Sequence, residues 1–341
     1  PDAELLSSLR LFLKNNPSPL LAEAGSNLTG IPGLAATADF FLGALPENDL
    51  KSLQPDLLIT WGHGIVSRNI RTFLRNYPAV EQWHIQAAGH AADTFMGLTR
   101  IIRCEPAEFF RTIAGLLVRK QTTEYKSLFM RHHRRTEQSV AFPSGTEAAW
   151  ISEVIKQIPS TFTLQLANSL SIRYANMFFG RNLHPKVKVF ANRGTSGIDG
   201  CTSTAIGHHI ASGGETILIT GDVGFFYDRN AFWPQPPDGK FRILLLNNHG
   251  GRIFNIIDGP KDRPEAGPLF VGEQPLDAQQ LCRETGMRYL NNKKEQNVQH
   301  LIREWLQPSE RATVLEIFTD PDQDRMAFEA IKTKLKSEYG N

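Results

Sequence analysis

Short, continuous apolar runs recur along this 341-residue chain, and most of them end in a glycine, an asparagine or another polar residue. Such a run is typical of a buried strand in a parallel sheet, and apolar residues at helical spacing lie between the runs. This alternation predicts an α/β fold with two doubly wound domains and mainly parallel sheets. Strands are expected at residues 20–25, 56–62, 83–86, 101–104, 163–167, 187–191, 215–220, 243–246 and 313–318. Helices are expected at residues 3–13, 35–44, 67–75, 108–118, 147–157, 201–211 and 326–339.

A polar, basic stretch interrupts the alternation before the middle of the chain. It contains the basic run 131–135, for which a solvated helix end or a linker is the ordinary explanation, and it ends in Pro-Ser-Gly at residues 143–145. Segments of this composition commonly separate domains. We therefore expect a first domain over residues 1–125, a linker over residues 126–144 and a second domain over residues 145–341.

The composition is that of an ordinary globular protein, with 41% hydrophobic residues, 21% charged residues and a net charge of +2. Basic and acidic residues nearly balance, which disfavours nucleic acid as a partner. Because Cys104, Cys201 and Cys282 are far apart, the sequence predicts neither a disulfide framework nor a zinc site, and it favours a reducing compartment. No apolar run is long enough for a membrane span, so we expect a cytoplasmic protein.

Two neighbouring predicted strands are each followed by residues suited to a metal ion. Asp222 follows the strand at 215–220, and Asn248 follows the strand at 243–246. The carboxyl ends of parallel strands meet at one rim, where open α/β sheets bind ligands. A carboxylate, an amide oxygen and the backbone carbonyl of Gly250 are hard donors suited to octahedral Mg²⁺. Either motif alone is commonly structural, but their pairing across one crossover predicts a site for a metal and a diphosphate.

Two further predicted strands bring arginines to the same rim. Ser169 and Arg173 follow the strand at 163–167, and Arg193 follows the strand at 187–191. Pairing with a surface carboxylate is the ordinary role of a single arginine. Two of them beside a diphosphate site indicate an anionic substrate, because guanidinium groups bind carboxylates in a bidentate way. Ser169 either donates a hydrogen bond to the same anion or caps the following helix.

Four motifs occur in order along the second half of the chain. They are residues 168–173 (NSLSIR), residues 192–200 (NRGTSGIDG), Gly221-Asp222 with the later residues 228–230 (DRN), and residues 247–254 (NNHGGRIF). Together they resemble the MenD family, the thiamine diphosphate-dependent 2-succinyl-5-enolpyruvyl-6-hydroxy-3-cyclohexene-1-carboxylate synthases of menaquinone biosynthesis. Thiamine diphosphate enzymes usually have a third glycine where this chain has Val223, and an aliphatic residue there fits this family. The resemblance is strong over residues 160–260 and looser before residue 120.

The resemblance implies a cofactor and metal site. Asp222, Asn248 and the carbonyl of Gly250 would hold Mg²⁺ or Mn²⁺, which anchors the diphosphate of thiamine diphosphate. Ile198 would lie under the cofactor and impose its bent V conformation, although ordinary core packing is the alternative for this residue. The other cofactor contacts implied are Ser196, Gly197, Gly221, Val223, Gly251, Phe254 and Ile257, of which the last two could equally be partly core.

The resemblance also implies the reaction and the partners. The enzyme would decarboxylate 2-oxoglutarate and add the succinyl unit to isochorismate in a 1,4 sense, with Ser169, Arg173 and Arg193 binding substrate carboxylates and Arg68 as a further substrate contact. The first domain would be the family's central, Rossmann-like domain and the second its diphosphate-binding domain. We expect the chain to be a C-terminal fragment without the pyrimidine-binding domain, inactive by itself, from a homodimer or homotetramer.

Three other functions compete with this interpretation. Another thiamine diphosphate-dependent 2-oxoacid decarboxylase or carboligase would not need two arginines at the rim. A non-catalytic module that retains the fold would bind neither metal nor cofactor. A nicotinamide dehydrogenase would use the Gly62-His63-Gly64 turn, but Ser67 occupies the third glycine position of that fingerprint, so a plain tight turn is favoured.

Overall fold

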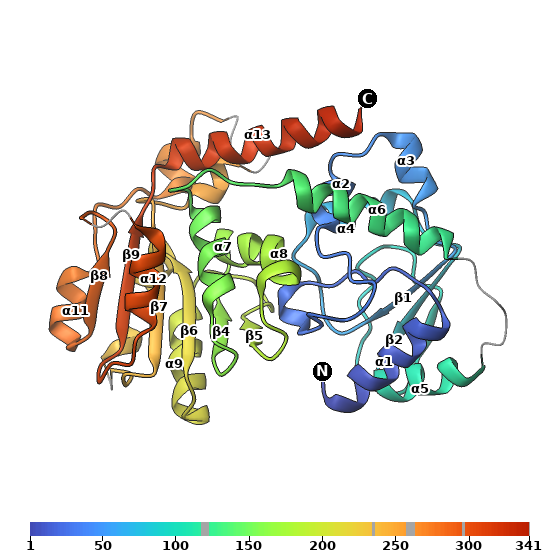
Figure 1. Cartoon of the computed structure of the whole chain (residues 1–341), viewed down its shortest axis with the longest axis horizontal. Helices are drawn as coiled ribbons and strands as arrows, with labels where there is room; N and C mark the ends of the chain where they lie inside the picture. Colours follow the sequence, from blue (N-terminus) through green and yellow to red (C-terminus); the bar gives the residue numbers. More distant parts are fainter. Residues whose placement is uncertain (117–122, 234–235, 257–262, 295–296, 341) are drawn as a thin grey trace. The chain divides into compact units, whose positions relative to one another are not determined.

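The computed structural model describes the chain except for residues 117–122, 234–235, 257–262, 295–296 and 341. It divides into two compact units (Figure 1): residues 1–140 with 331–341, and residues 141–330. Most of the expected linker 126–144 is helix α6 (Glu124–Ser139), which belongs to the first unit. The expected division also assigned residues 331–341 to the second domain. They group with the first unit, where the hydroxyl of Tyr339, at the end of α13 (Pro321–Tyr339), lies 2.9 Å from Thr136 Oγ1.

The first unit contains a three-stranded parallel sheet in the order β1 (Leu57–Trp61), β2 (Glu81–Ile85), β3 (Arg100–Ile102). Helix α1 (Ala3–Asn15) packs on α5 (Pro106–Leu116). Phe110 of α5 lies between Phe12 of α1 and Trp61 of β1, with ring centroids 5.2 and 4.9 Å away. A second group of helices is α2 (Ala38–Leu42), α4 (Arg68–Asn76) and α6, and short helical segments lie at η1 (Ala24–Ser26) and α3 (Glu47–Ser52).

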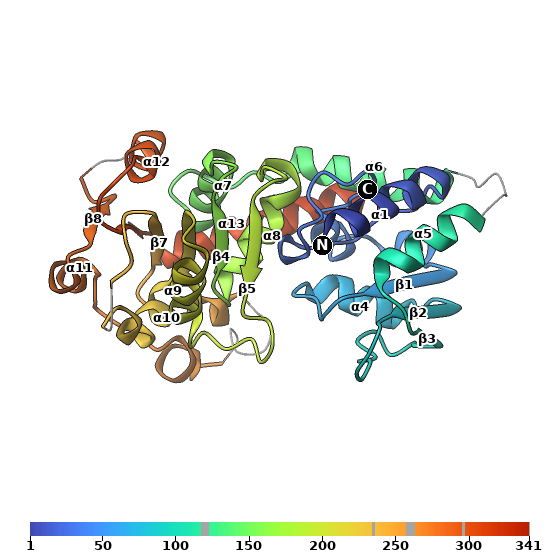
Figure 2. The ribbon, with the colours of Figure 1, turned by 90° about the horizontal axis from the view of Figure 1, so that it is seen from below.

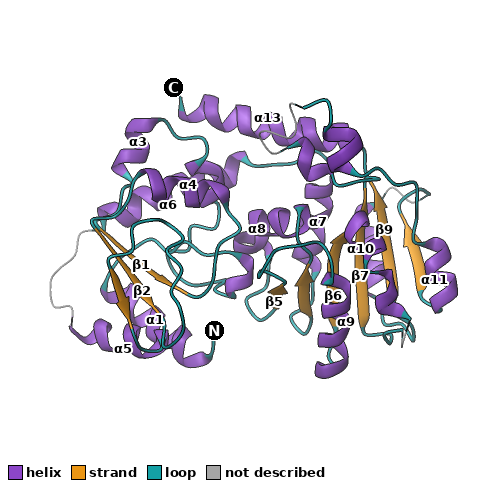
Figure 3. Ribbon diagram, turned by 180° about the vertical axis from the view of Figure 1, so that it is seen from behind, coloured by secondary structure: helices purple, strands orange, loops and turns teal. Residues whose placement is uncertain are grey.

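The second unit contains a six-stranded sheet in which every pair of neighbouring strands is parallel (Figure 3). Its order is β5 (Lys188–Ala191), β4 (Thr163–Leu166), β6 (Thr216–Gly221), β7 (Phe241–Asn247), β9 (Thr313–Phe318), β8 (Arg288–Asn291). β7 is buried along its whole length. The continuous apolar runs of the sequence therefore form the centre of this sheet, where both faces are covered.

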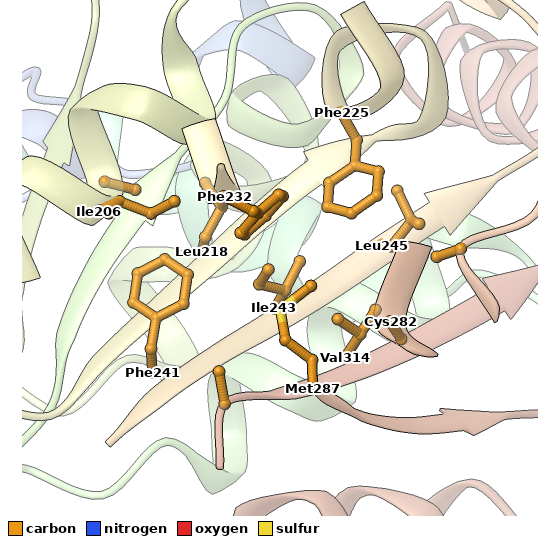
Figure 4. Close-up of a cluster of buried hydrophobic side chains, with 13 residues drawn as sticks. Ile206, Leu218, Phe225, Phe232, Phe241, Ile243, Leu245, Cys282, Met287 and Val314 are labelled. Carbon is orange, nitrogen blue, oxygen red and sulfur yellow. The ribbon is translucent and has the colours of Figure 1, made fainter. Parts of the chain in front are cut away.

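Helices cover the larger sheet on both faces, as Figure 2 shows. One face carries α7 (Glu147–Gln157), α8 (Leu170–Asn182) and α12 (Val298–Leu306), and the other carries α9 (Cys201–Ser212), α10 (Asp222–Tyr227) and α11 (Gln279–Thr285). On the second face, side chains of Leu218, Ile243 and Leu245 meet Phe225 and Phe232 in a closed apolar cluster (Figure 4). Burying one such side chain contributes about 1.5–3 kcal/mol, so this cluster holds the strand ends in place.

The strand order contains a topological switch point. The chain leaves β4 for its neighbour β5 on one side and then returns to β6 on the other side of β4. The connections after β4 and β6 therefore diverge at the carboxyl ends of these strands, the edge at which open α/β sheets form their ligand-binding crevice. Asn168 and Ser169 follow β4, and Asp222 follows β6 without any intervening loop. The fold thus places these three residues at that edge.

The predicted fold class is confirmed, and the strands and helices expected between residues 147 and 246 are present within a few residues. The strand expected at residues 20–25 is wrong, because Leu20 forms only an isolated bridge with Leu34 and a 3₁₀ turn follows at η1. The sequence prediction also omitted the edge strand β8 and helices α3, α11 and α12, which are short or polar. Among the residues that the structure describes, no helix is long and apolar enough to cross a membrane.

Candidate active site

Asp222 stands at the point where β6 becomes α10. Its side chain is 2% exposed, and one carboxylate oxygen accepts a hydrogen bond from Gln274 Nε2 at 2.7 Å. The same Nε2 donates to Asn247 Oδ1 at 3.2 Å, so Gln274 joins the ends of β6 and β7 around one buried acid. Burial raises the pKa of Asp222, and the bond from Gln274 and the nearby backbone N–H groups of Val223 and Gly250 partly oppose the shift.

The first asparagine of the Asn-Asn pair builds the turn after β7. Asn247 is fully buried, and its Nδ2 donates to the carbonyl of Leu276 at 2.9 Å and to Glu316 Oε1 at 2.7 Å. Its Oδ1 accepts from the backbone N–H of His249 at 3.1 Å. His249 has a φ of +59°, a left-handed conformation that this short-range bond supports. Asn247 is therefore a structural residue.

The second asparagine presents an acceptor without a partner. Asn248 is 4% exposed, and its Nδ2 donates to Glu147 Oε1 at 2.9 Å. Within the described part of the chain, its buried Oδ1 has no hydrogen-bond partner. A buried carbonyl oxygen in this state costs about 1–3 kcal/mol unless something else binds it. This oxygen is the kind of atom that a cation would satisfy.

The two glycines after the Asn-Asn pair permit a close backbone approach. A Cβ at Gly250 would lie 2.7 Å from Val271 Cγ1, and one at Gly251 would lie 3.1 Å from the Val271 carbonyl, at the end of η5 (Ala266–Val271). The N–H of Gly251 donates to that carbonyl at 2.6 Å. Phe254, in η3 (Arg252–Asn255), packs beside it with its ring 5.6 Å from that of Phe270. Larger residues would push this segment away from the turn.

The donor set fits a hard divalent cation. Asp222 offers a buried carboxylate, and Asn248 offers an amide oxygen that no described residue bonds. The carbonyl of Gly250 accepts from Arg252 N–H at 2.9 Å and has a second lone pair. Oxygen donors of these types suit Mg²⁺ or Mn²⁺ completed by phosphate and water. The described residues contain no cluster of three or more His, Cys, Asp or Glu side chains that could hold a metal, so a site here draws on the amide and the carbonyl as well.

Asn168 joins the two strand ends on the other side of the crevice. It is 2% exposed, and its Nδ2 donates to the carbonyls of Asn192 at 2.7 Å and Gly197 at 2.6 Å. Its Oδ1 accepts from Arg193 Nη1 at 2.7 Å. One buried amide thus fixes both the loop after β5 and the position of the Arg193 guanidinium group.

Ser169 has a backbone conformation that only glycine adopts readily. Its φ is +76° and its ψ is −130°, at a sharp turn between β4 and α8. Strain of about 1–3 kcal/mol at such a residue persists where the surroundings impose it, and it is common at functional sites. The carbonyl of Ser169 accepts from Arg173 Nη1 at 2.7 Å. Arg173 and Arg193 therefore both contact the turn that contains Ser169, and the role predicted for these three residues in substrate binding stays a prediction.

The loop after β5 contacts the start of α10. A Cβ at Gly224 would lie 3.2 Å from the carbonyl of Ile198, so the glycine allows this approach. Thiamine diphosphate enzymes usually have a glycine at the position of Val223, and in this chain Gly224, one residue later, allows the close approach. The side chain of Asp199 folds against Gly197, and Ser196 has a φ of +64°. Ile198 is half-buried beside the crevice and is not part of the closed core.

Two contacts of the site were not predicted from the sequence. Glu147 bonds Asn248, and Gln274 bonds both Asp222 and, at 3.2 Å, Asn247 Oδ1. Glu147 follows Thr146 at the start of α7, where an acid resembles an ordinary helix-terminus residue. Gln274 lies in an irregular segment. Neither position carries a signal in a single sequence.

Other predicted residues lie elsewhere. Ile257 is outside the described residues. Arg68 belongs to the first unit, at the first residue of α4, so its predicted substrate contact stays a prediction. The motif at residues 228–230 follows α10, and Asp228 precedes the 3₁₀ helix η2 (Arg229–Phe232). The carboxylate of Asp228 accepts from the backbone N–H of Ser203 at 2.7 Å, in the first turn of α9.

The glycine turn after β1 is already occupied by protein groups. The carboxylate of Glu23 accepts from the backbone N–H groups of Val66 and Ser67, each at 2.7 Å, and Asp39 accepts from the Ser67 hydroxyl. In a dinucleotide fold, the pyrophosphate binds at this helix N-terminus. Two carboxylates there disfavour the nicotinamide interpretation.

Several known proteins similar to this chain share one name. No family model matches the chain. It is 35% identical over 340 residues to the 2-succinyl-5-enolpyruvyl-6-hydroxy-3-cyclohexene-1-carboxylate synthase of Cytophaga hutchinsonii. The aligned region covers 97% of this chain and 60% of that relative. Synthases of the same name from Flavobacterium johnsoniae and Phocaeicola vulgatus are 33% and 34% identical, over 91% and 94% of this chain. The chain spans 56–60% of the length of these curated relatives.

Proposed function

This chain belongs to the family of 2-succinyl-5-enolpyruvyl-6-hydroxy-3-cyclohexene-1-carboxylate synthases, and from that premise we propose that its second unit is the metal- and diphosphate-binding part of a thiamine diphosphate-dependent synthase. The observation that carries the proposal is the buried Asn248 Oδ1, which has no partner among the described residues and follows Asn247, a residue that shares the Gln274 amide with Asp222. Buried polar atoms in folded proteins nearly always have a hydrogen-bond partner, so an exception calls for an explanation. A Mg²⁺ or Mn²⁺ ion would satisfy it.

The metal would be held by Asp222, Asn248 and the carbonyl of Gly250. When bound, thiamine diphosphate supplies the nucleophilic carbon and the electron sink that decarboxylation of a 2-oxo acid requires. Around it, Gly221, Ser196 and Gly197 offer backbone close to a diphosphate, and the other implied contacts are Ile198, Val223, Gly251, Phe254 and Ile257. The protein's task is to orient the reactants and exclude water.

The arginines would bind and orient the substrates. The proposed substrates, 2-oxoglutarate and isochorismate, each carry two carboxylates. Arg173 and Arg193 are both fixed by a hydrogen bond to the β4–α8 turn, which reduces the entropy lost when a carboxylate binds. A guanidinium group presents five N–H donors in a planar fork, so it can contact this turn and a carboxylate through different edges. Ser169 adds a hydroxyl donor at the same turn.

The proposed product, an intermediate of menaquinone biosynthesis, provides the test. A protein with the full length of the relatives is assayed with thiamine diphosphate, Mg²⁺, 2-oxoglutarate and isochorismate. We expect isochorismate consumption with CO₂ release in the wild type, and a loss of at least about 1,000-fold in Asp222→Ala. Asp322→Ala, at an exposed position of α13, is the matched control and should retain activity. Separately, the 341-residue chain by itself is expected to be inactive.

Two outcomes would redirect the proposal. If the wild type decarboxylates another 2-oxo acid and ignores isochorismate, the cofactor assignment survives and the substrate assignment does not. If the full-length protein binds neither Mg²⁺ nor thiamine diphosphate, the fold serves a non-catalytic role and the proposal is wrong.

A further inference from the structure

Glu147 is a buried acid whose side chain accepts a hydrogen bond from a proposed metal ligand. It is the first residue of α7 and is 2% exposed. Its Oε1 accepts from Asn248 Nδ2 at 2.9 Å, and its Oε2 is buried without a partner among the described residues. Asp324 and Asp222 lie near enough to raise its pKa further after burial has done so. Such a placement destabilises the fold, which favours a functional reason for the residue.

The orientation of the Asn248 amide decides whether this residue can bind a cation. The two ends of the amide differ in hydrogen-bonding character, since one is a pair of donors and the other is an acceptor. Only the oxygen can coordinate a metal. A carboxyl group offers an acceptor to the amide, so Glu147 attracts the nitrogen of Asn248 and directs the oxygen away from itself.

Glu147 is itself held in place. Its backbone N–H donates to Asp324 Oδ1 at 2.8 Å, and Asp324 Oδ2 accepts from Thr319 Oγ1 at 2.7 Å. The preceding residue, Thr146, caps α7 by accepting from the N–H of Ala149 at 3.3 Å. The start of α7 is thereby joined to the end of β9 and the start of α13. The acceptor that faces Asn248 is fixed before any metal arrives.

We propose that Glu147 is a positioning residue of the metal centre, which keeps the Asn248 amide turned with its oxygen toward the cation. This inference rests on the metal site in the proposed function. Outer residues that orient metal ligands commonly change metal affinity by about 10–100-fold when they are replaced. The effect requires the bond between Glu147 and Asn248, so it can be separated from a general effect on folding.

Binding of Mn²⁺ provides a test that does not depend on activity. The free Mn²⁺ signal is followed by electron paramagnetic resonance with thiamine diphosphate present, on the full-length protein. Glu147→Met keeps the volume and removes the acceptor, so we expect Mn²⁺ to bind about 10–100-fold more weakly. Glu147→Gln keeps an acceptor oxygen and should stay within about threefold of the wild type. Glu147→Asp retracts the carboxylate and should be intermediate, which provides a second measure if Glu147→Met does not fold.

Asn248→Asp separates orientation from packing. A carboxylate has two equivalent oxygens, so its orientation needs no selection. In the Asn248→Asp background, Glu147→Met is therefore expected to change Mn²⁺ affinity by less than about threefold, which makes the two substitutions strongly non-additive. A structural role for Glu147 would instead lower the melting temperature of the metal-free protein and leave the Mn²⁺ affinity unchanged.

The outcomes distinguish this inference from the proposed function. If wild-type protein does not bind Mn²⁺, the metal site is wrong and the positioning role falls with it. If the wild type binds Mn²⁺ and both Glu147→Met and Glu147→Asp bind it equally well, only the positioning role is wrong. Equal losses from Glu147→Met in the Asn248 and Asn248→Asp backgrounds would also overturn it, because packing would then explain the effect.

Discussion

The two sides of the crevice in the second unit differ in charge and in burial. On the β6–β7 side, Asp222 and Asn248 are at most 4% exposed, and Asn248 Oδ1 has no partner in the part of the chain that the structure describes. On the β4–β5 side, Ser169, Arg173 and Arg193 are half-buried, and both arginines donate to the turn that contains Asn168 and Ser169.

The difference follows from what each side would bind. A metal that stays in place is bound best by rigid, dehydrated oxygen ligands, and their cost in stability is offset when the metal binds. Substrates enter and leave in every turnover, so the groups that bind their carboxylates must remain accessible. We therefore expect substitutions on the β6–β7 side to change metal affinity, and substitutions on the β4–β5 side to change substrate turnover.

Among the substitutions that compare the two sides, Asn248→Ala is expected to have the largest effect, which is on Mn²⁺ affinity. Loss of the amide oxygen should weaken Mn²⁺ binding by at least about 100-fold, since even outer residues change it by 10–100-fold. The free energy of unfolding should change little, because two effects offset one another. The variant removes the buried Asn248 Oδ1, which has no partner among the described residues, but it also leaves Glu147 Oε1 without its donor. The measurements are Mn²⁺ titration and urea unfolding.

Asn247→Ala is the matched control for that prediction. It removes the four side-chain hydrogen bonds of Asn247 and should lower the free energy of unfolding by about 2–3 kcal/mol. If the two alanine variants had the same effects on stability and metal affinity, the division of roles between the asparagines would be wrong.

Arg193→Leu should affect turnover and spare the metal. A hydrogen bond to a charged group is worth about 1.5–3 kcal/mol, so we expect kcat/KM to fall by about 10–100-fold while the Mn²⁺ affinity stays within about twofold. Arg193→Lys keeps the charge without the planar fork and should be intermediate. Arg283→Leu, at an exposed position of α11, controls for loss of a surface charge. A parallel loss of metal affinity in Arg193→Leu would contradict the separation of the two sides.

Ser169→Gly and Ser169→Ala should separate strain from chemistry. Glycine adopts the backbone conformation of Ser169 without strain, so Ser169→Gly should stabilise the protein by about 1 kcal/mol after its own entropic cost. Ser169→Ala retains a Cβ and gains nothing. Both lose the hydroxyl and should lose activity to the same degree. Thermal unfolding and steady-state kinetics of the pair test this, and equal stability in both variants would exclude strain at this turn.

The smallest effect concerns pH. Glu316 is fully buried in β9, where burial raises its pKa although Tyr289, Asn247 and the Ala278 N–H donate to it. The folded protein therefore holds a proton that the unfolded chain releases near pH 4.5, so this group's contribution to stability falls as the pH rises through its folded pKa. We expect urea unfolding of metal-free protein to show a stability that decreases from pH 5 to pH 8, and Glu316→Gln should reduce this decrease. Identical pH profiles for wild type and variant would show that Glu316 does not titrate in this range.

Much of the site could be predicted because its residues directly follow strands. In a parallel sheet, every carboxyl end lies at the same edge, so the positions of Asp222, Asn248, Ser169 and Arg193 along the chain were enough to expect them near one another. The sequence predicted Asn248 as a ligand, but it did not show what Asn247 does or which distant residues give the two asparagines different roles. That difference depends on which side chain meets Glu316 and which meets Glu147, and both acids are distant in sequence.

The sequence by itself determined the α/β class, most of the strands of the larger sheet and the candidate ligands Asp222, Asn248 and Gly250, because apolar periodicity and strand-end chemistry are local properties. Only the tertiary structure decided the order of the strands, the grouping of residues 331–341 with the first unit, the strained turn at Ser169 and the contacts of Glu147 and Gln274 with the ligands. These features depend on packing between segments far apart in the chain, and a local pattern does not record which distant side chain will complete a buried polar group.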